Sequence, residues 1–166
     1  MFPAMADAER TRRGSLVQEI IVIFSTGLYT GYSPIAPGTV GTMLAVALYL
    51  ALSRLSPVSY GITVLAFLLM ACWTAGMAEH ILRTRDSQRI VIDEVAGFLV
   101  TMTFLPPTTG HMLLGFALFR LFDMVKPFPI RRLEGLKGGY GVVADDVMAG
   151  IYANMVVRVC IFLWQG

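Results

Sequence analysis

Three long stretches of this chain contain no Asp, Glu, Lys or Arg, and they occupy residues 20–53, 55–78 and 95–119. A helix needs about 20 apolar residues to cross a bilayer, so stretches of this length favour membrane helices over a soluble core. Only 14% of the 166 residues are charged and the mean hydropathy is +0.69, whereas soluble domains carry roughly 25% charged residues. The length predicts one domain. Pro and Gly interrupt several of the stretches, which leaves a soluble or shallow helical protein as an alternative.

The composition also argues against several other classes of protein. The net charge is only +2 and no basic run is interleaved with aromatic residues, so nucleic acid is not an expected partner. Cys72 and Cys160 lie in apolar segments and are interpreted as buried thiols. The basic residues near the N-terminus are followed by Gln18 and Glu19 rather than by an apolar run with a cleavage site, which argues against a signal peptide.

Turn residues and apolar runs predict an all-α fold, a compact polytopic bundle of about five to six helices. Residues 1–14 are polar and predict a disordered basic tail, and residues 15–166 predict a single helical domain. Ser15 can cap a first helix that is too short to span and is expected to lie at the membrane interface. The expected helices occupy residues 16–29, 39–52, 58–78, 90–105, 111–124 and 145–164.

The segment GYSPIAPGTVGT, residues 31–42, cannot form a regular helix because it holds two Pro and three Gly. Irregular backbone beside a membrane is tolerated only where protein buries it or where it lines a polar cavity. The segment is therefore either a simple turn or part of a site.

The expected turns bring most of the acidic residues to one end of the bundle. If the turns at residues 54–57 and 106–110 lie on one membrane face, the other helix ends lie on the opposite face. Basic loops and the basic N-terminus mark that opposite face as cytoplasmic. The acids expected there are Glu79, Asp86, Asp93, Glu94, Asp123, Asp145 and Asp146.

Carboxylates gathered in an apolar setting repel one another, so a cation is expected among them. The chain has no HxxH or CxxC pair, which argues against zinc, and an all-oxygen set of ligands suits Mg²⁺, with Mn²⁺ as a substitute. Mg²⁺ usually completes its shell with water and phosphate oxygens, which points to a phosphoryl substrate.

Basic residues and a glycine-rich loop near these acids suit the same kind of substrate. Arg120, Lys126 and Arg131 can hold phosphate charge. The loop that contains Gly138 and Gly139 can aim backbone N–H groups at an anion. The helix expected to start at Asp145 would border the same site.

Purely structural roles stay open for most of the acids. The Asp pair 145–146 could act only as a helix cap, Asp123 could form a structural ion pair, and the acids near residue 80 could be solvated. Asp93 and Glu94 are harder to explain this way because apolar residues flank them on both sides. The chain lacks the motifs of cysteine, histidine and aspartyl-phosphate phosphatases, which leaves metal-assisted hydrolysis by water.

Four segments, taken together, resemble the phosphatidylglycerophosphatase A family. They are YSPIAPGTVGT (32–42), IVIDEVAGFLV (90–100), FRLFDMVKPFPIRRLE (119–134) and GGYGVVADDVMAG (138–150). The resemblance covers residues 27–153 with the motifs in the family's order, and the Arg-rich N-terminal extension lies outside it.

The resemblance implies hydrolysis of phosphatidylglycerophosphate to phosphatidylglycerol and phosphate, with Mg²⁺, at the cytoplasmic face of the bacterial inner membrane. It implies an all-helical fold and a phospholipid partner, and a homo-oligomer stays open. The expected metal ligands are Asp93, Glu94, Asp123, Asp145 and Asp146, with Glu79 or Asp86 as further ligand or base. The same five acids and Lys126 are the expected catalytic residues. The expected phosphate contacts are Arg120, Lys126 and Arg131, and the pocket floor would be completed by Pro37, Gly38 and Thr39.

Three alternatives remain: a metal-dependent phosphatase for another lipid or soluble phosphate ester, a small ion transporter, and a scaffold without activity. A transporter would place its acids near the bilayer midplane rather than at helix ends.

Overall fold

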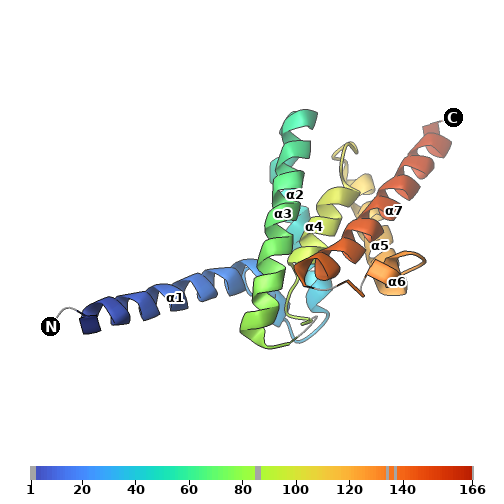
Figure 1. The fold of residues 1–166 in the computed structure, drawn as a ribbon. Coiled ribbons are helices and arrows are strands. Elements are labelled where there is room, and N and C mark those ends of the chain that lie inside the picture. The colour runs from blue at the N-terminus through green and yellow to red at the C-terminus, as the bar shows by residue number, and fades with distance from the viewer. Residues whose placement is uncertain (1–2, 85–86, 134, 137, 166) are drawn as a thin grey trace.

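In the computed structural model the chain is a bundle of α-helices (Figure 1). The structure describes residues 3–84, 87–133, 135–136 and 138–165, with side chains from residue 14 to residue 164 within these ranges. The elements are α1 (Pro3–Ser25), the 3-10 helix η1 (Thr30–Tyr32), α2 (Pro37–Leu52), α3 (Pro57–Leu82), α4 (Ile92–Thr101), α5 (Thr109–Val125), α6 (Ile130–Leu133) and α7 (Gly139–Gln165). No strand occurs in these ranges, so the all-α prediction is confirmed.

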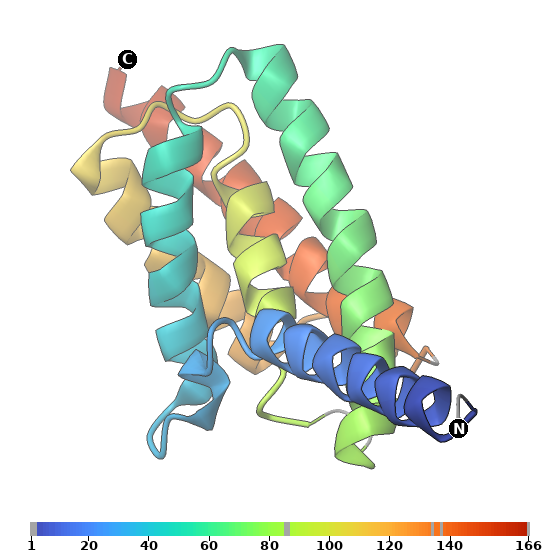
Figure 2. The ribbon, with the colours of Figure 1, turned by 90° about the vertical axis from the view of Figure 1, so that its left-hand side faces the viewer.

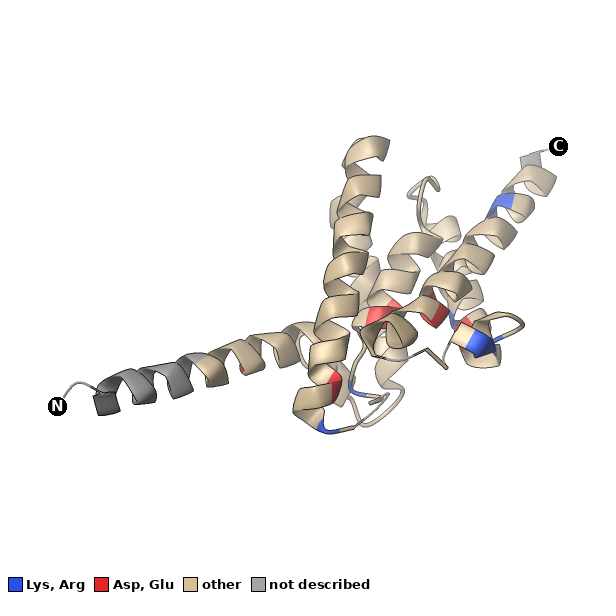
Figure 3. Cartoon of the chain, viewed as in Figure 1, with Lys and Arg blue, Asp and Glu red and all other residues tan. Residues whose placement is uncertain are grey.

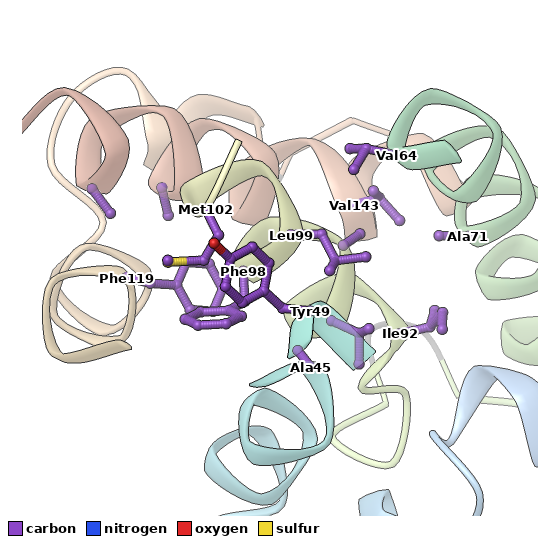
Figure 4. Close-up of a cluster of buried hydrophobic side chains, with 14 of the residues drawn as sticks. Ala45, Tyr49, Val64, Ala71, Ile92, Phe98, Leu99, Met102, Phe119 and Val143 are labelled. Carbon is purple, nitrogen blue, oxygen red and sulfur yellow. The ribbon is translucent and has the colours of Figure 1, made fainter. Parts of the chain in front are cut away.

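The short helix α4 lies in the middle of the bundle, packed against α2, α3 and α7. Of its ten residues only Glu94 and Val100 are not buried. The Phe98 ring meets Tyr49 and Phe119 edge to face, with centroids 6.5 and 6.4 Å away (Figure 4). It meets Phe116 in the same way at 6.3 Å. Contacts of this geometry add to the hydrophobic free energy of burial. An apolar α4 is therefore stabilised by its neighbours rather than by its own length.

The bundle has two chemically different ends. The turn between α2 and α3 and the connection between α4 and α5 lie together at one end, as Figure 2 shows. There the Tyr49 hydroxyl donates to the carbonyl of Leu105 at 3.3 Å. Most of the Asp, Glu, Lys and Arg residues that Figure 3 colours lie toward the other end. The predicted convergence of the two turns at one end is confirmed.

Among the described residues, the helices long and apolar enough to cross a membrane are α3 and α7. The candidate span in each is 26 residues long. Less than a third of the most apolar window of each is buried inside the bundle. Large apolar side chains such as Leu65, Leu69 and Trp73 are exposed along α3. Contact with lipid would explain why so large an apolar surface is exposed. This observation agrees with the predicted helical membrane bundle.

Two predicted helix starts are wrong. α1 begins at Pro3 rather than after Ser15, so residues 3–14 form helix and not the predicted disordered tail. The segment after Pro3 is rich in Ala and Arg, which are good helix formers, and Pro suits the first turn. α7 begins at Gly139, six residues before the predicted start at Asp145. The short elements η1 and α6 were not predicted, and α4 ends at Thr101 instead of residue 105.

Candidate active site

Three acids from two helices form the centre of the candidate site. Asp93 and Glu94 lie in the first turn of α4, and Asp146 lies inside α7. One carboxylate oxygen from each lies within 4.8 Å of the others. α4 and α7 approach this closely because Gly97 has no side chain: an added Cβ would lie 2.6 Å from the Asp146 carbonyl oxygen. Gly97 therefore places the acids of α4 beside the acid of α7.

The end of α5 adds an acid and a base to this group. Arg120 Nη1 lies 2.5 Å from Asp123 Oδ2 and 3.9 Å from Glu94 Oε1. All three side chains are less than one-fifth exposed. The guanidinium of Arg120 thus connects Asp123 to the carboxylates of α4.

Lys126 connects the end of α5 to α7. It ends α5 in the left-handed conformation, with φ 47°, as expected for a residue that Pro127 biases out of the helix. Its Nζ donates to Asp145 Oδ2 at 2.7 Å, and the Asp145 side chain is only 8% exposed. The two Asp residues that adjoin on α7 therefore have different partners, Lys126 for Asp145 and the acids of α4 for Asp146.

The first turn of α2 lies against the same group. A Cβ at Gly38 would lie 3.1 Å from Arg120 Nη1 and would overlap the carboxylate of Glu94. Pro37 is the first residue of α2 and Thr39 is half-buried beside Gly38. Because the first backbone N–H groups of a helix have no partner within it, this end favours nearby negative charge.

Burial controls the electrostatics of the acids at the start of α4. Burial raises the pKa of Asp93 well above its usual range, and the nearby charges of Glu94 and Asp146 raise it further. Burial also raises the pKa of Glu94; its hydrogen bond with Asp93 and the charge of Arg120 lower it, while the charge of Asp123 raises it. The site thus holds its carboxylates in a setting that disfavours their ionised form.

The chemistry of the donors fits a hard divalent cation. Within the described residues, Glu94 Oε2 and Asp145 Oδ1 are buried and have no hydrogen-bond partner. Unpaired buried oxygens are costly, and a cation among them would remove that cost. All ligand atoms of the central group are carboxylate oxygens, which is the set that Mg²⁺ prefers. Arg120 Nε is also buried without a partner and is a suitable donor to a phosphate oxygen.

The structure separates several predicted residues from this group. Among the described acids, the central group does not include Glu79, which lies near the end of α3. Arg131 is exposed on α6. Gly138 is exposed, and Gly139 packs against α3, where its added Cβ would lie 2.6 Å from the backbone N of Gly76. Asp86 lies outside the described residues.

The predicted position of Asp145 and Asp146 at the start of α7 is wrong. Asp145 and Asp146 lie more than one turn inside the helix, so they are neither its cap nor a helix-terminal anion site. Gly139 is needed for close packing of α7 on α3, and this explains a glycine there without a phosphate ligand.

The sequence analysis missed the glycines at the crossing of α4 and α7. Gly97 contacts the backbone of α7, and a Cβ on Gly150 would overlap the carbonyl of Gly97. The available signal was the pair of small residues Ala96 and Gly97 inside an otherwise apolar helix, since small residues let helix backbones approach closely.

Comparison with known proteins decides the family. A sequence profile of the phosphatidylglycerophosphatase A family matches residues 23–161, which include every residue of the group described above. The chain belongs to this family. The match begins inside α1 and ends inside α7, so it covers all of α3 and most of α7.

Three relatives are similar to the chain in sequence, and two of them carry the name of this family. The chain is 37% identical over 141 residues to a phosphatidylglycerophosphatase A of Haemophilus influenzae, covering 82% of the chain and 86% of the relative. The phosphatidylglycerophosphatase A of Escherichia coli is 30% identical over 131 residues, covering 78% and 76%. A Bacteroides thetaiotaomicron protein provisionally named phosphatidylinositol-3-phosphatase is 36% identical over 146 residues, covering 83% and 91%. No solved structure matches the chain.

Proposed function

We propose that this protein is a Mg²⁺-dependent lipid phosphatase that hydrolyses phosphatidylglycerophosphate to phosphatidylglycerol and phosphate. The observation that carries the proposal is the group of Asp93, Glu94 and Asp146, whose oxygens lie within 4.8 Å of one another near the starts of α4 and α7 in an apolar bundle. Membership of the phosphatidylglycerophosphatase A family supports this substrate. The closeness of these acids favours a bound cation over a scaffold without activity.

The residues that would hold Mg²⁺ are Asp93, Glu94 and Asp146, with Asp123 beside them. When bound, Mg²⁺ supplies a water of lowered pKa and neutralises phosphate charge. Glu94 Oε2, which is buried without a partner among the described residues, is the oxygen most in need of such a ligand.

The basic residues would orient the phosphate. Arg120 keeps Nη1 on Asp123 and has Nε without a partner in the described part of the chain, so it can donate to a phosphate oxygen without leaving the acid. Lys126 would hold Asp145 in place and add positive charge beside the phosphate. The backbone N–H groups of Gly38 and Thr39 belong to the first turn of α2, where Gly38 lies against Glu94 and Arg120, and they would contact a further oxygen.

The site would face the cytoplasm at the inner membrane. The charged end contains the basic loops, and an excess of Lys and Arg marks the cytoplasmic side of membrane proteins. A phospholipid could then keep its acyl chains beside the exposed apolar surfaces of α3 and α7 while its head group reaches the acids.

The test is phosphate release from phosphatidylglycerophosphate in neutral detergent, with Mg²⁺ and with EDTA, for the wild type and Asp123→Asn. We expect release with Mg²⁺ only, and a loss of at least about a hundredfold in a folded Asp123→Asn protein. Asn has nearly the same shape as Asp, so the variant is expected to fold. A melting temperature equal to that of the wild type would show that the fold is intact. Turnover equal to that of the wild type would show that Asp123 is not needed for hydrolysis.

A second substrate is included because one relative carries the name of a phosphatidylinositol-3-phosphatase. Phosphatidylinositol 3-phosphate is therefore tested alongside phosphatidylglycerophosphate under the same conditions. Faster release from the inositol lipid would replace the proposed substrate and keep the metal chemistry. Release from neither lipid would favour a transporter or a scaffold.

A further inference from the structure

A polar cavity of about 470 Å³ lies beside the candidate active site. Its lining includes Tyr32, Ser33, Pro37, Gln88 and Arg89. Pro37 joins the cavity to the active site, because the next residue, Gly38, lies against Glu94 and Arg120. The cavity therefore adjoins the candidate active site at the start of α2.

Arg89 is the positively charged side chain among the described residues that line this cavity. Its guanidinium carbon lies 5.1 Å from the centroid of the Tyr32 ring, so the ring supports one face of the guanidinium. Stacking leaves the N–H groups at the edge of the guanidinium able to donate to an anion. None of the ion pairs between described residues involves Arg89. The charge of Arg89 is thus held over Tyr32 without a carboxylate to neutralise it in the described part of the chain.

The backbone fixes Arg89 relative to the catalytic acids. Ile90 N donates to the carbonyl of Ser87 at 2.8 Å, and Val91 N donates to the carbonyl of Ser25 at 3.0 Å. Gly31 leaves no room for a Cβ against the Arg89 carbonyl. α4, which carries Asp93, begins three residues after Arg89. A substrate that contacts both Arg89 and the acids would therefore meet a rigid spacing.

The chemistry of the two lipids named above matches this arrangement. Phosphatidylglycerophosphate and phosphatidylinositol 3-phosphate both carry a phosphomonoester on a polyol, and a phosphodiester joins that polyol to diacylglycerol. Phosphatidate carries a phosphomonoester without the phosphodiester. A second anion site beside the hydrolytic centre would distinguish the first two lipids from the third.

We propose that the cavity beside α2 binds the phosphodiester of the lipid substrate, with Arg89 as its charged ligand and Tyr32 as the residue that positions Arg89. The proposal rests on the function proposed above, since it assigns the phosphomonoester to the acids and the phosphodiester to this cavity. It makes Arg89 a determinant of substrate specificity.

The first test is binding, which does not depend on turnover. Dihexanoylphosphatidylglycerol has the phosphodiester and no phosphomonoester, and dihexanoylglycerol has neither. Calorimetric titration in neutral detergent should give a dissociation constant for the phosphatidylglycerol that rises about tenfold in Arg89→Gln, the loss expected for one charged hydrogen bond. Binding of dihexanoylglycerol should not change.

Arg132→Gln is the matched control for this variant. Arg132 is also exposed and stacked on an aromatic ring, with its guanidinium carbon 4.8 Å from the centroid of Phe128, but it does not line the cavity. Its substitution should leave the dissociation constant unchanged. An unchanged constant in Arg89→Gln, or an equal rise in Arg132→Gln, would overturn the proposal.

The second test separates the phosphodiester of the substrate from that of a neighbouring phospholipid. In neutral detergent without other lipids, Arg89→Gln should lower kcat/KM about tenfold for phosphatidylglycerophosphate and leave it unchanged for phosphatidate, while Arg89→Lys should keep part of the preference. An equal loss for both substrates, or a loss that requires added phosphatidylglycerol, would overturn the proposal. Failure of the wild type to release phosphate from any lipid would refute the proposed function, whereas the binding test would still decide whether the cavity takes a phosphodiester.

Discussion

Replacing Asp146 by Asn should abolish activity and, at the same time, stabilise the metal-free protein. One oxygen of Asp146 lies within 4.8 Å of oxygens of Asp93 and Glu94. Two unit charges at this distance repel by about 3 kcal/mol at an effective dielectric constant of about 20. Buried acids escape part of this repulsion by taking up protons, so we expect Asn to stabilise by about 1–3 kcal/mol. For a chain of this size that is a rise in melting temperature of roughly 3–10 °C.

Magnesium should reverse the order of stability. A ligand present at a hundred times its dissociation constant stabilises the folded state by about 2.7 kcal/mol. The wild type should gain this stability with Mg²⁺, whereas Asp146→Asn, which lacks one ligand, should gain little. The variant should therefore melt above the wild type in EDTA and at or below it in excess Mg²⁺.

The assay is thermal unfolding of the purified protein in detergent, in EDTA and in Mg²⁺, paired with phosphate release. Glu19→Gln is the control, because Glu19 is exposed on α1 away from the acids. It should match the wild type in both solutions. Two results would contradict the argument that repulsion between these acids favours metal binding. One is a melting temperature of Asp146→Asn below that of the wild type in EDTA. The other is a rise in melting temperature with Mg²⁺ as large in the variant as in the wild type.

Two further predictions concern Lys126 and Gly139. Lys126→Met removes the cation that pairs with the largely buried Asp145, so it should destabilise the protein by about 2 kcal/mol and lower kcat/KM. Lys126→Arg should keep much of the stability and of the activity. Unchanged turnover and melting temperature in Lys126→Met would show that the 2.7 Å ion pair contributes to neither. Gly139→Val places a side chain against the backbone of α3 and should cost about 3 kcal/mol, measured as lost yield of folded protein and a lower melting temperature. Gly110→Ala, where a Cβ meets nothing within 4 Å, should change stability by less than about 1 kcal/mol, and equal behaviour of the two variants would contradict the packing argument.

The sequence predicted the helices well where charge and turn residues mark their limits. The absence of charge over residues 55–78 identified α3, and the Pro residues near positions 57 and 107 located both turns at the end away from the acids. The motifs that contain Asp93 and Asp146 identified two helices that meet, although nothing local in either motif gives the distance between them. Placement of residues at the expected helix ends thus predicted that Asp93, Glu94 and Asp146 gather, but it also included Glu79, which the central group does not contain.

The start of α7 could not be predicted because tertiary packing overrides local propensity. The run from Gly138 to Gly141 is typical of a loop, yet α7 begins at Gly139, where contact with Gly76 of α3 leaves no space for a side chain. The same contact gives Gly139 a packing role against α3, whereas the sequence analysis expected it to bind phosphate. Gly97 was missed for a related reason, since its importance depends on a helix that comes later in the chain.

The central place of α4 has a consequence for the biosynthesis of this protein. With ten residues α4 is about 15 Å long, too short to cross a bilayer by itself. Asp93 and Glu94 are synthesised before Asp146, which lies near the start of α7, the last helix of the chain. A chain that ends before Asp146 therefore has no complete group of acids to bind a metal. The group of acids is therefore complete only once the first third of α7 packs against α4, and the remainder of α7 adds no acid to it.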